Sequence, residues 1–218
     1  MINEIQIVEN AFTYIKGIFS DDCSGHDYYH SIRVYKNALT IAQKEGGNIF
    51  QIKLGALLHD VDDRKLFDTS EKLQNARNFL KENCVDDSSI DEICNIIKSV
   101  SFKGNESVVP DSIEGKIIQD ADRLDAIGAI GVARTFAYGG HKNRPIYVPN
   151  ENPIDNMTAD EYENHISSSI NHFYEKLLKL KNLMNTDTAK LFAEKRHVFM
   201  EEYLDEFMNE WEGENKWK

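Results

Sequence analysis

The chain has 218 residues, of which 41% are hydrophobic, and its 25 basic and 37 acidic side chains give a formal net charge of −12. One compact domain over residues 1–218 is the expectation for this length. The net charge argues against nucleic acid and anionic membranes as partners, because both repel an acidic chain without a block of Lys and Arg.

Neither a membrane-spanning segment nor a secretory leader is expected. The longest uninterrupted apolar stretch runs only from Ala126 to Ala133, and the first twenty residues carry Glu4 and Glu9 rather than a basic and then apolar leader. Three cysteines, Cys23, Cys84 and Cys94, match neither a disulfide framework nor a zinc knuckle. We therefore expect a reduced, cytoplasmic protein whose cysteines fill the core.

The predicted regular structure is helical. Apolar residues recur at spacings of three and four, and the alternation typical of strands is scarce. Three of the four prolines lie in one loop between Ala137 and Thr158, which leaves long stretches free to be helical. The predicted helices cover residues 2 to 19, 26 to 45, 49 to 61, 70 to 83, 87 to 99, 111 to 137, 158 to 183 and 186 to 211. The expected fold class is all-α.

The second predicted helix carries a histidine on its apolar side. His30 is followed at helical spacing by Val34 and Ala38, so its imidazole is expected to face the core. His26 and Arg33 share this side of the helix. An ionisable group in such a place is costly unless it is hydrogen-bonded or bound to a partner.

The third predicted helix ends in a histidine–aspartate pair. The run from Leu54 to Leu58 is apolar, and His59 and Asp60 follow it. If the helix continues for one more turn, the carboxylate of Asp63 stands over the same place, where it could orient a water or move a proton. Asp62, Arg64 and Lys65 complete a charged turn here, and a solvated helix end is an equally good interpretation of that turn.

The sixth predicted helix has a carboxylate in an apolar stripe, because Asp125 follows Ile118 and Ala121 at helical spacing. Alone, each of these buried ionisable residues is explained more simply as a hydrogen-bonded core or capping residue. Together they are explained by one shared cation, which two imidazoles and two carboxylates bind in their deprotonated forms. The candidate metal ligands are His30, His59, Asp60 and Asp125.

These residues resemble a known family. His30, the pair His59-Asp60 and Asp125 look like the H…HD…D signature of the HD-domain metal-dependent phosphohydrolases. The segment from His26 to Val34 is similar to the HDxxHxxRV opening of the small bacterial branch of this family, and the segment from His172 to Leu178 resembles its C-terminal portion. The resemblance implies a compact all-helical HD-domain bundle with C-terminal helices packed on it. It also implies hydrolysis of phosphate esters or anhydrides, with nucleotides as the usual substrates and the four candidate residues as metal ligands.

One divalent ion is expected. Two nitrogen and two oxygen ligands suit Mn²⁺, Mg²⁺, Fe²⁺, Co²⁺ or Zn²⁺, and Mn²⁺ is our prediction because relatives in the resembled family often use it. No histidine lies between Asp60 and Asp125. Since two-metal members of the family use additional histidines there, this argues for a single metal and against two-iron oxygenase chemistry.

A small phosphorylated substrate needs local positive charge in this acidic protein. Residues 126 to 150 contain no Asp or Glu, and basic residues flank Gly139-Gly140, so this loop could close over phosphates. A basic surface loop paired with the acidic C-terminal helix is the alternative. The candidate substrate contacts are His26, Arg33, Lys65, Arg134, Lys142 and Arg144.

The resemblance leaves several functions open. The first is a nucleoside triphosphate pyrophosphohydrolase or a nucleotidase, and the second is a hydrolase of guanosine polyphosphate alarmones. The third is a catalytically idle, metal-bound sensory or binding module. The complete ligand set argues against lost activity. No pattern in the sequence selects the base, the sugar, the bond that is cleaved or the number of subunits.

Overall fold

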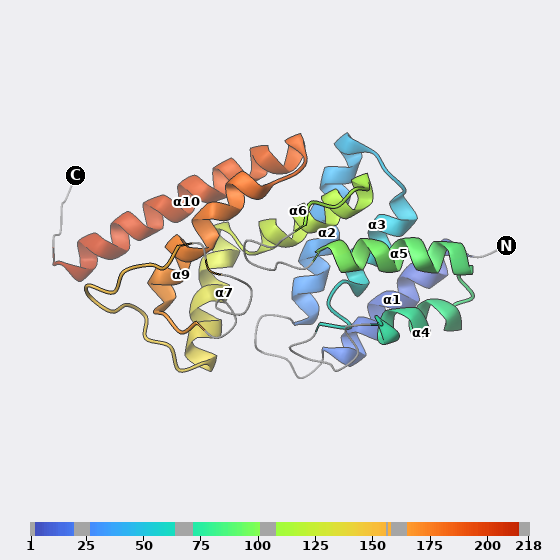
Figure 1. The fold of residues 1–218 in the computed structure, drawn as a ribbon, viewed down its shortest axis with the longest axis horizontal. Coiled ribbons are helices and arrows are strands. Elements are labelled where there is room, and N and C mark those ends of the chain that lie inside the picture. Colours follow the sequence, from blue (N-terminus) through green and yellow to red (C-terminus); the bar gives the residue numbers. More distant parts are fainter. Residues whose placement is uncertain are drawn as a thin grey trace.

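The structure is a computed structural model, and the residues it describes are 3–19, 27–63, 72–100, 108–155, 157 and 165–213. Within these ranges every regular element is a helix, which confirms the all-α prediction (Figure 1). The elements are α1 (Glu4–Ile18), α2 (Tyr28–Glu45), α3 (Ile49–Leu58), α4 (Gln74–Glu82), α5 (Asp87–Val100), α6 (Ile113–Asp125), α7 (Gly128–His141), α9 (Ser169–Glu175), the 3₁₀-helix η2 (Leu177–Leu183) and α10 (Asp187–Trp211). No helix of the described part is long and apolar enough to cross a membrane.

The molecule is elongated, with α1 to α5 at the end near the N-terminus and α7, α9 and α10 at the other end (Figure 1). Within the first group α2 lies nearest the middle, beside α6, and α10 contacts α7, α6 and α2. One buried cluster joins α2 and α6 to α9, η2 and α10, and a second cluster joins α1, α4 and α5. The charged residues at the ends of α2, α3 and α6 therefore meet in the middle of the molecule.

Helix α3 belongs to both buried clusters. Its residues Ile52 and Ala56 lie in the first cluster, whereas Leu54, Leu57 and Leu58 lie in the second. A helix that packs on two sides must be apolar all round, which explains its uninterrupted apolar run. The chain that leaves the C-terminal end of α3 therefore starts inside the protein.

Side-chain caps fix where the helices that carry the site begin. Asp27 accepts a hydrogen bond from the backbone nitrogen of His30 at 2.6 Å, which starts α2. Ser112 starts α6 by accepting from the nitrogen of Gly115 at 3.0 Å. Thr186 does the same for α10. These short polar residues satisfy backbone groups that the first turn leaves unpaired.

The predicted helix over 111 to 137 is wrong, because the structure has two helices there. Helix α6 ends at Asp125, and α7 begins at Gly128, whose φ of +76° lies in the left-handed region that a right-handed helix does not enter. A Cβ at Gly128 would lie 2.9 Å from the side chain of Arg196 on α10. The break thus lets α10 approach the end of α6.

Two other predicted helices are shorter than expected. Helix α3 ends at Leu58, and residues 59–62 form a turn in which the nitrogen of Asp63 donates to the carbonyl oxygen of Asp60 at 3.0 Å. The predicted helix over 158 to 183 is interrupted, since residues 165–168 are not helical and η2 replaces the last α-helical turns. Its first part lies outside the described residues.

The cysteines fit the core prediction only in part. Cys94 is buried in α5 and is free, as expected. Cys84 is free but exposed, in a turn after α4 with a φ of +57°, so the prediction that it fills the core is wrong. A residue in such a turn faces solvent because the chain reverses there. Cys23 lies outside the described residues.

Candidate metal centre

Side chains from three segments meet at one point. His30 comes from the first turn of α2, His59 and Asp60 from the turn after α3, and Asp122 from the last turn of α6. The Nε2 atoms of the two histidines are 3.3 Å apart, and Oδ2 of Asp60 is 3.3 Å from each of them. Oδ1 of Asp122 is 3.4 Å from Nε2 of His30. Ligand atoms of His30, His59 and Asp122 all lie within 4.8 Å of one another, and Asp60 joins them through its contacts with both histidines.

Hydrogen bonds on the far edge of each ring orient the two imidazoles. Nδ1 of His59 donates to the carbonyl oxygen of Ala56 at 2.9 Å, and Nδ1 of His30 donates to Oδ2 of Asp125 at 2.7 Å. These partners assign the proton to Nδ1 in both rings and leave the Nε2 lone pairs directed at the common space. This arrangement is typical of histidines that bind metal ions.

The donor set fits a divalent cation. Ligand atoms that bind one ion at about 2.1 Å lie about 3.0 to 3.4 Å from their neighbours, which covers the spacings found between these side chains. Without a cation, the neighbouring carboxylates favour protonation of His59. Burial lowers the pKa of His59, but the charge and hydrogen bond of Asp60 have the larger combined effect and raise this pKa to about 9. A cation would replace this proton.

Asp125 lies behind His30 and contacts its Nδ1, on the opposite edge of the ring from the convergence point. Its Oδ1 accepts from Nε of Arg33 at 2.7 Å, and its Oδ2 accepts from Nη1 of Arg134 at 2.8 Å. Burial alone would raise the pKa of Asp125, but the hydrogen bonds from His30 and Arg33 and the charge of Arg134 hold it well below its usual range. The structure therefore departs from the sequence-based assignment, because Asp122 stands where that assignment put Asp125.

A charged group inside an apolar stripe is the sequence signal that selects Asp125, and Asp122 does not give this signal. That signal selects buried residues, and the Asp125 side chain is only 2% exposed. The Asp122 side chain is 27% exposed, so it does not belong to the buried stripe of α6. The usable signal was the spacing of three, which puts both carboxylates on one side of α6.

A second aspartate was assigned only to a charged turn. Asp62 is buried, and its two carboxylate oxygens accept from the backbone nitrogens of Asn75 and Ala76, both at 2.9 Å. Asp62 thus caps the start of α4 and ties the turn after α3 to it. Asp63, the candidate catalytic residue, is half-buried beyond that turn, so the continued helix assumed for it is absent.

The candidate substrate contacts lie in different places. Arg33 and Arg134 both bind Asp125. Lys142 and Arg144 lie over the ring of Tyr138, with their charged groups 5.8 and 5.6 Å from its centroid. The other two candidates, His26 and Lys65, lie outside the described residues. Of the six candidates, Arg33 and Arg134 thus contact Asp125, which in turn contacts His30 of the converging group.

Comparison with known proteins places this geometry in a family. The HD domain family matches residues 27–127, which include all the converging side chains. An HD-superfamily hydrolase from Bacillus thuringiensis is 43% identical, with 96% of this chain and 99% of that chain covered and a TM-score of 0.76. A protein of known structure from Lactobacillus plantarum is 40% identical, with 98% and 100% covered and a TM-score of 0.86.

Bacillus subtilis YpgQ has been solved in complex with ADP. That structure is 35% identical to this chain, with 93% of this chain and 97% of YpgQ covered and a TM-score of 0.75. In sequence alone, YpgQ is 39% identical over 206 residues, which are 93% of each chain. The chain belongs to the HD-superfamily hydrolases and is a metal-dependent phosphohydrolase.

Proposed function

We propose that this protein hydrolyses nucleotides, as a nucleoside triphosphate pyrophosphohydrolase or a nucleotidase. The observation that carries the proposal is the convergence of His30, His59, Asp60 and Asp122 within 3.3 to 3.4 Å contacts. The solved complex of the relative YpgQ with ADP supports a nucleotide as the ligand class. A nucleotide also carries the anhydride and ester bonds on which metal-dependent phosphohydrolases act.

These four side chains would hold one divalent cation, and we propose Mn²⁺, because hard oxygen ligands and imidazoles both suit it. When bound, the cation would polarise a phosphoryl oxygen and lower the pKa of a bound water toward neutrality. Asp122 takes the place in this ligand set that the sequence analysis gave to Asp125. Asp125 instead holds the ring of His30 in its binding orientation through Nδ1.

Other side chains of the centre would assist the reaction. Arg33 and Arg134 keep Asp125 charged, and their positive charges stand beside the place where phosphate would bind. Asp63 is held next to Asp60 by its backbone hydrogen bond of 3.0 Å, and we propose that its carboxylate moves a proton to or from the attacking water. Lys142 and Arg144 are proposed as outer phosphate contacts.

The test is a substrate panel with product identification. The purified protein, loaded with Mn²⁺, is assayed against ribonucleotides, deoxyribonucleotides and guanosine polyphosphates, and the products are followed by phosphorus spectroscopy. We expect pyrophosphate from triphosphates for a pyrophosphohydrolase, and orthophosphate for a nucleotidase. Hydrolysis of guanosine polyphosphates alone would replace this proposal with an alarmone hydrolase.

Variants separate the proposed roles. His59→Ala is expected to lose both metal and turnover, since it removes a ligand atom. Asp63→Asn is expected to slow turnover at least tenfold while the metal content stays unchanged. A metal-loaded protein that leaves the whole panel intact, or a His59→Ala variant as active as the parent, would contradict the proposal.

A further inference from the structure

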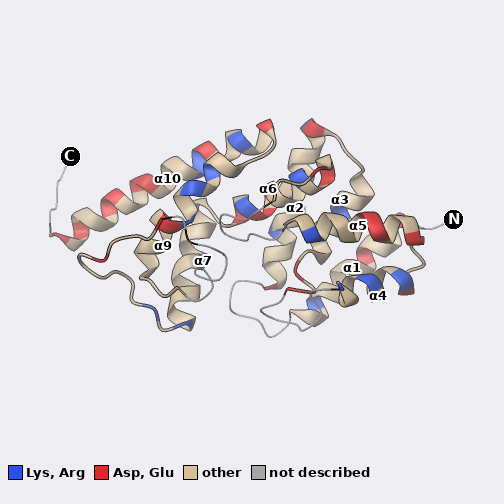
Figure 2. Cartoon of the chain, viewed as in Figure 1, with Lys and Arg blue, Asp and Glu red and all other residues tan. Residues whose placement is uncertain are grey.

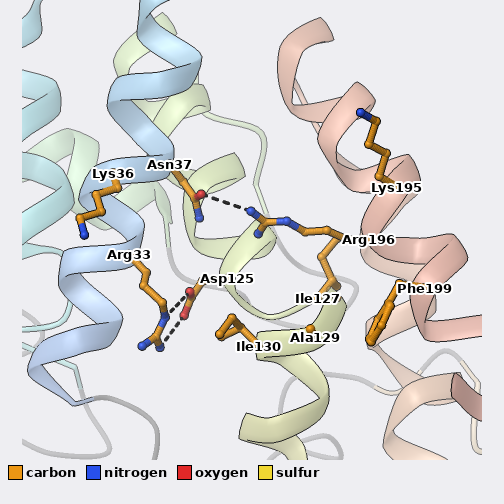
Figure 3. Close-up of a pocket in the computed structure, with 11 residues that line it drawn as sticks. Arg33, Lys36, Asn37, Asp125, Ile127, Ala129, Ile130, Lys195, Arg196 and Phe199 are labelled. Atoms are coloured by element: carbon orange, nitrogen blue, oxygen red, sulfur yellow. Dashed lines mark hydrogen bonds and ion pairs between the residues drawn. The ribbon is translucent and has the colours of Figure 1, made fainter.

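A pocket next to the metal centre has Asp125 in its lining. Its volume is about 410 Å³, and it is formed by α2, the turn between α6 and α7, and α10 (Figure 3). None of the described residues that line it belongs to the converging group of His30, His59, Asp60 and Asp122. Small-molecule sites start at about 300 Å³, so the pocket has room for a ligand of its own.

Positive charge gathers around this pocket. Arg33 and Lys36 line it from α2, and Lys195 and Arg196 line it from α10. Asp125 is the one carboxylate among the described lining residues, and both its oxygens accept hydrogen bonds from arginines. The pocket lining thus has four basic side chains and one carboxylate, which is already hydrogen-bonded, although the whole chain has a net charge of −12. This local excess of positive charge favours an anionic ligand.

These cations retain donors that a ligand could use. Arg33 binds Asp125 through Nε and Nη2, so its Nη1 remains to donate. Arg196 donates through Nη2 to Oδ1 of Asn37 at 3.3 Å and through Nη1 to the carbonyl oxygen of Leu124, which leaves its Nε (Figure 3). Lys36 and Lys195 also line the pocket, but their side chains extend away from Asp125 (Figure 3), and in the described part of the chain neither ammonium group has a hydrogen bond or ion pair.

The start of α7 adds to this field. Gly128 and Ile130 belong to its first turn and line the pocket, and Ile127 at the N-cap makes no side-chain hydrogen bond to the amides of that turn. Amides at the start of a helix attract anions. The stem of Arg196 packs on Gly128, where a Cβ would be 2.9 Å from it, so the glycine is required for this arginine to lie in the pocket.

One wall of the pocket is apolar and open. Ile130 is 46% exposed and Phe199 is 43% exposed, from α7 and α10 respectively. Large apolar side chains on the wall of a charged pocket offer a surface on which a ring or other apolar group can stack. Charge on one wall and apolar surface on the other suit a ligand that has both.

We propose that this pocket is a second binding site, for an organic phosphate that is bound independently of the metal. Its phosphate groups would lie among the cations of α2 and α10, and its aromatic or apolar part would lie on Ile130 and Phe199. Asp125 is common to the two places, since it contacts His30 and also lines the pocket. A ligand here would contact Asp125 and Arg33 but none of the four converging side chains.

The test measures binding to the full-length protein by titration calorimetry in EDTA, so that metal-dependent binding is absent. The probes are ADP, inorganic pyrophosphate and adenosine. We expect ADP to bind, pyrophosphate to bind at least threefold more weakly, and adenosine to show no binding. Pyrophosphate that binds as tightly as ADP would overturn the role given to Ile130 and Phe199.

Charge-reversal variants locate the site. The double variant Lys36→Glu and Lys195→Glu is expected to weaken ADP binding in EDTA at least tenfold. Lys190→Glu is the matched control, because Lys190 is also exposed on α10 but lies outside the pocket, paired with Asp187 at 3.0 Å. The control is expected to bind ADP as the parent does, and circular dichroism confirms that each variant is folded.

His59→Ala distinguishes this pocket from the metal centre. We expect it to lose metal but to keep ADP binding in EDTA. If His59→Ala abolishes this binding and the double variant does not, ADP sits at the metal centre and the proposal is overturned. Absence of any ADP binding in EDTA overturns it as well. Neither result bears on hydrolysis, which is measured separately with Mn²⁺ present.

Discussion

Two aspartates one helical turn apart, Asp122 and Asp125, have different environments in α6. Asp122 faces the convergence point and is partly exposed, whereas Asp125 is buried between His30 and two arginines. One carboxylate is thus free to bind a cation, and the other is already saturated with protein donors. Metal binding and fold stability should therefore depend on different residues.

Asparagine variants test this division. In EDTA, Asp125→Asn is expected to lower the free energy of unfolding by about 2 to 3 kcal/mol, because His30 and the two arginines lose the negative charge that they contact. The partial exposure of the arginines limits this loss. Asp122→Asn is expected to leave this free energy nearly unchanged but to abolish metal binding. Urea denaturation and metal analysis measure both. Equal destabilisation by the two variants would contradict the division.

The raised pKa of His59 predicts how metal binding depends on pH. Its pKa of about 9 in the metal-free fold exceeds the ordinary value of 6.5, so protonation stabilises the metal-free fold below 6.5, and this contribution is lost as pH rises through 9. A cation needs the neutral ring, so it competes with this proton. The increase in Tm caused by Mn²⁺ should therefore be larger at pH 8 than at pH 6. Thermal unfolding with Mn²⁺ or EDTA measures it, and a larger increase at pH 6 would contradict the argument.

At the scale of the elements, the turn after α3 is fixed from both sides. Helix α3 is buried in two clusters, and Asp62 ties the turn to the start of α4. His59 and Asp60 therefore sit on a rigid connection rather than on a free loop. Such support is what holds ligand atoms close to their binding geometry.

Removal of this tie should affect both stability and metal affinity. Asp62→Ala leaves two buried amides unpaired, with an expected loss of about 1 to 3 kcal/mol in the free energy of unfolding. It should also weaken Mn²⁺ binding severalfold, because the turn is released. Asp86→Ala is the control: Asp86 accepts from the nitrogen of Ser89 at 3.0 Å, but far from the metal centre. A control that weakens Mn²⁺ binding as much as Asp62→Ala would contradict this role.

The break between α6 and α7 gives a second test at this scale. In Gly128→Ala, the alanine would have to adopt a left-handed backbone conformation, and its Cβ would lie 2.9 Å from the side chain of Arg196. The substitution is therefore expected to lower the free energy of unfolding by about 1 to 3 kcal/mol. Gly140→Ala, in the same helix with nothing within 4 Å of an added Cβ, is expected to be about 0.5 kcal/mol more stable than the parent. Denaturation curves decide, and a stabilising Gly128→Ala would contradict the packing described.

The sequence predicts the helices whose signals are local. Apolar periodicity predicts helices over 26 to 45 and 186 to 211, and the structure has α2 at Tyr28–Glu45 and α10 at Asp187–Trp211. The break at Gly128 was not predictable in this way, because it follows from packing against Arg196, 68 positions along the chain. Likewise, the sequence indicates which segments supply carboxylates, but the choice between Asp122 and Asp125 depends on the ring of His30, which comes from another helix.

At the scale of the whole molecule, charge is distributed unevenly (Figure 2). Acidic side chains follow the C-terminal half of α10, where residues 197–213 contain no Lys or Arg. The basic residues of α10 lie earlier in the helix, where it faces α2 and α6. The acidic part of α10 therefore lies away from the middle of the molecule, and its basic part lies beside the pocket that Lys195 and Arg196 line.

The central claim is that this middle holds one cation between helices α2, α3 and α6. Anomalous diffraction from crystals grown with Mn²⁺ tests it most directly. The account predicts a single strong peak bonded to His30, His59, Asp60 and Asp122, with Asp125 still on Nδ1 of His30. A peak bonded to Asp125 instead of Asp122, or no peak among these residues, would contradict it.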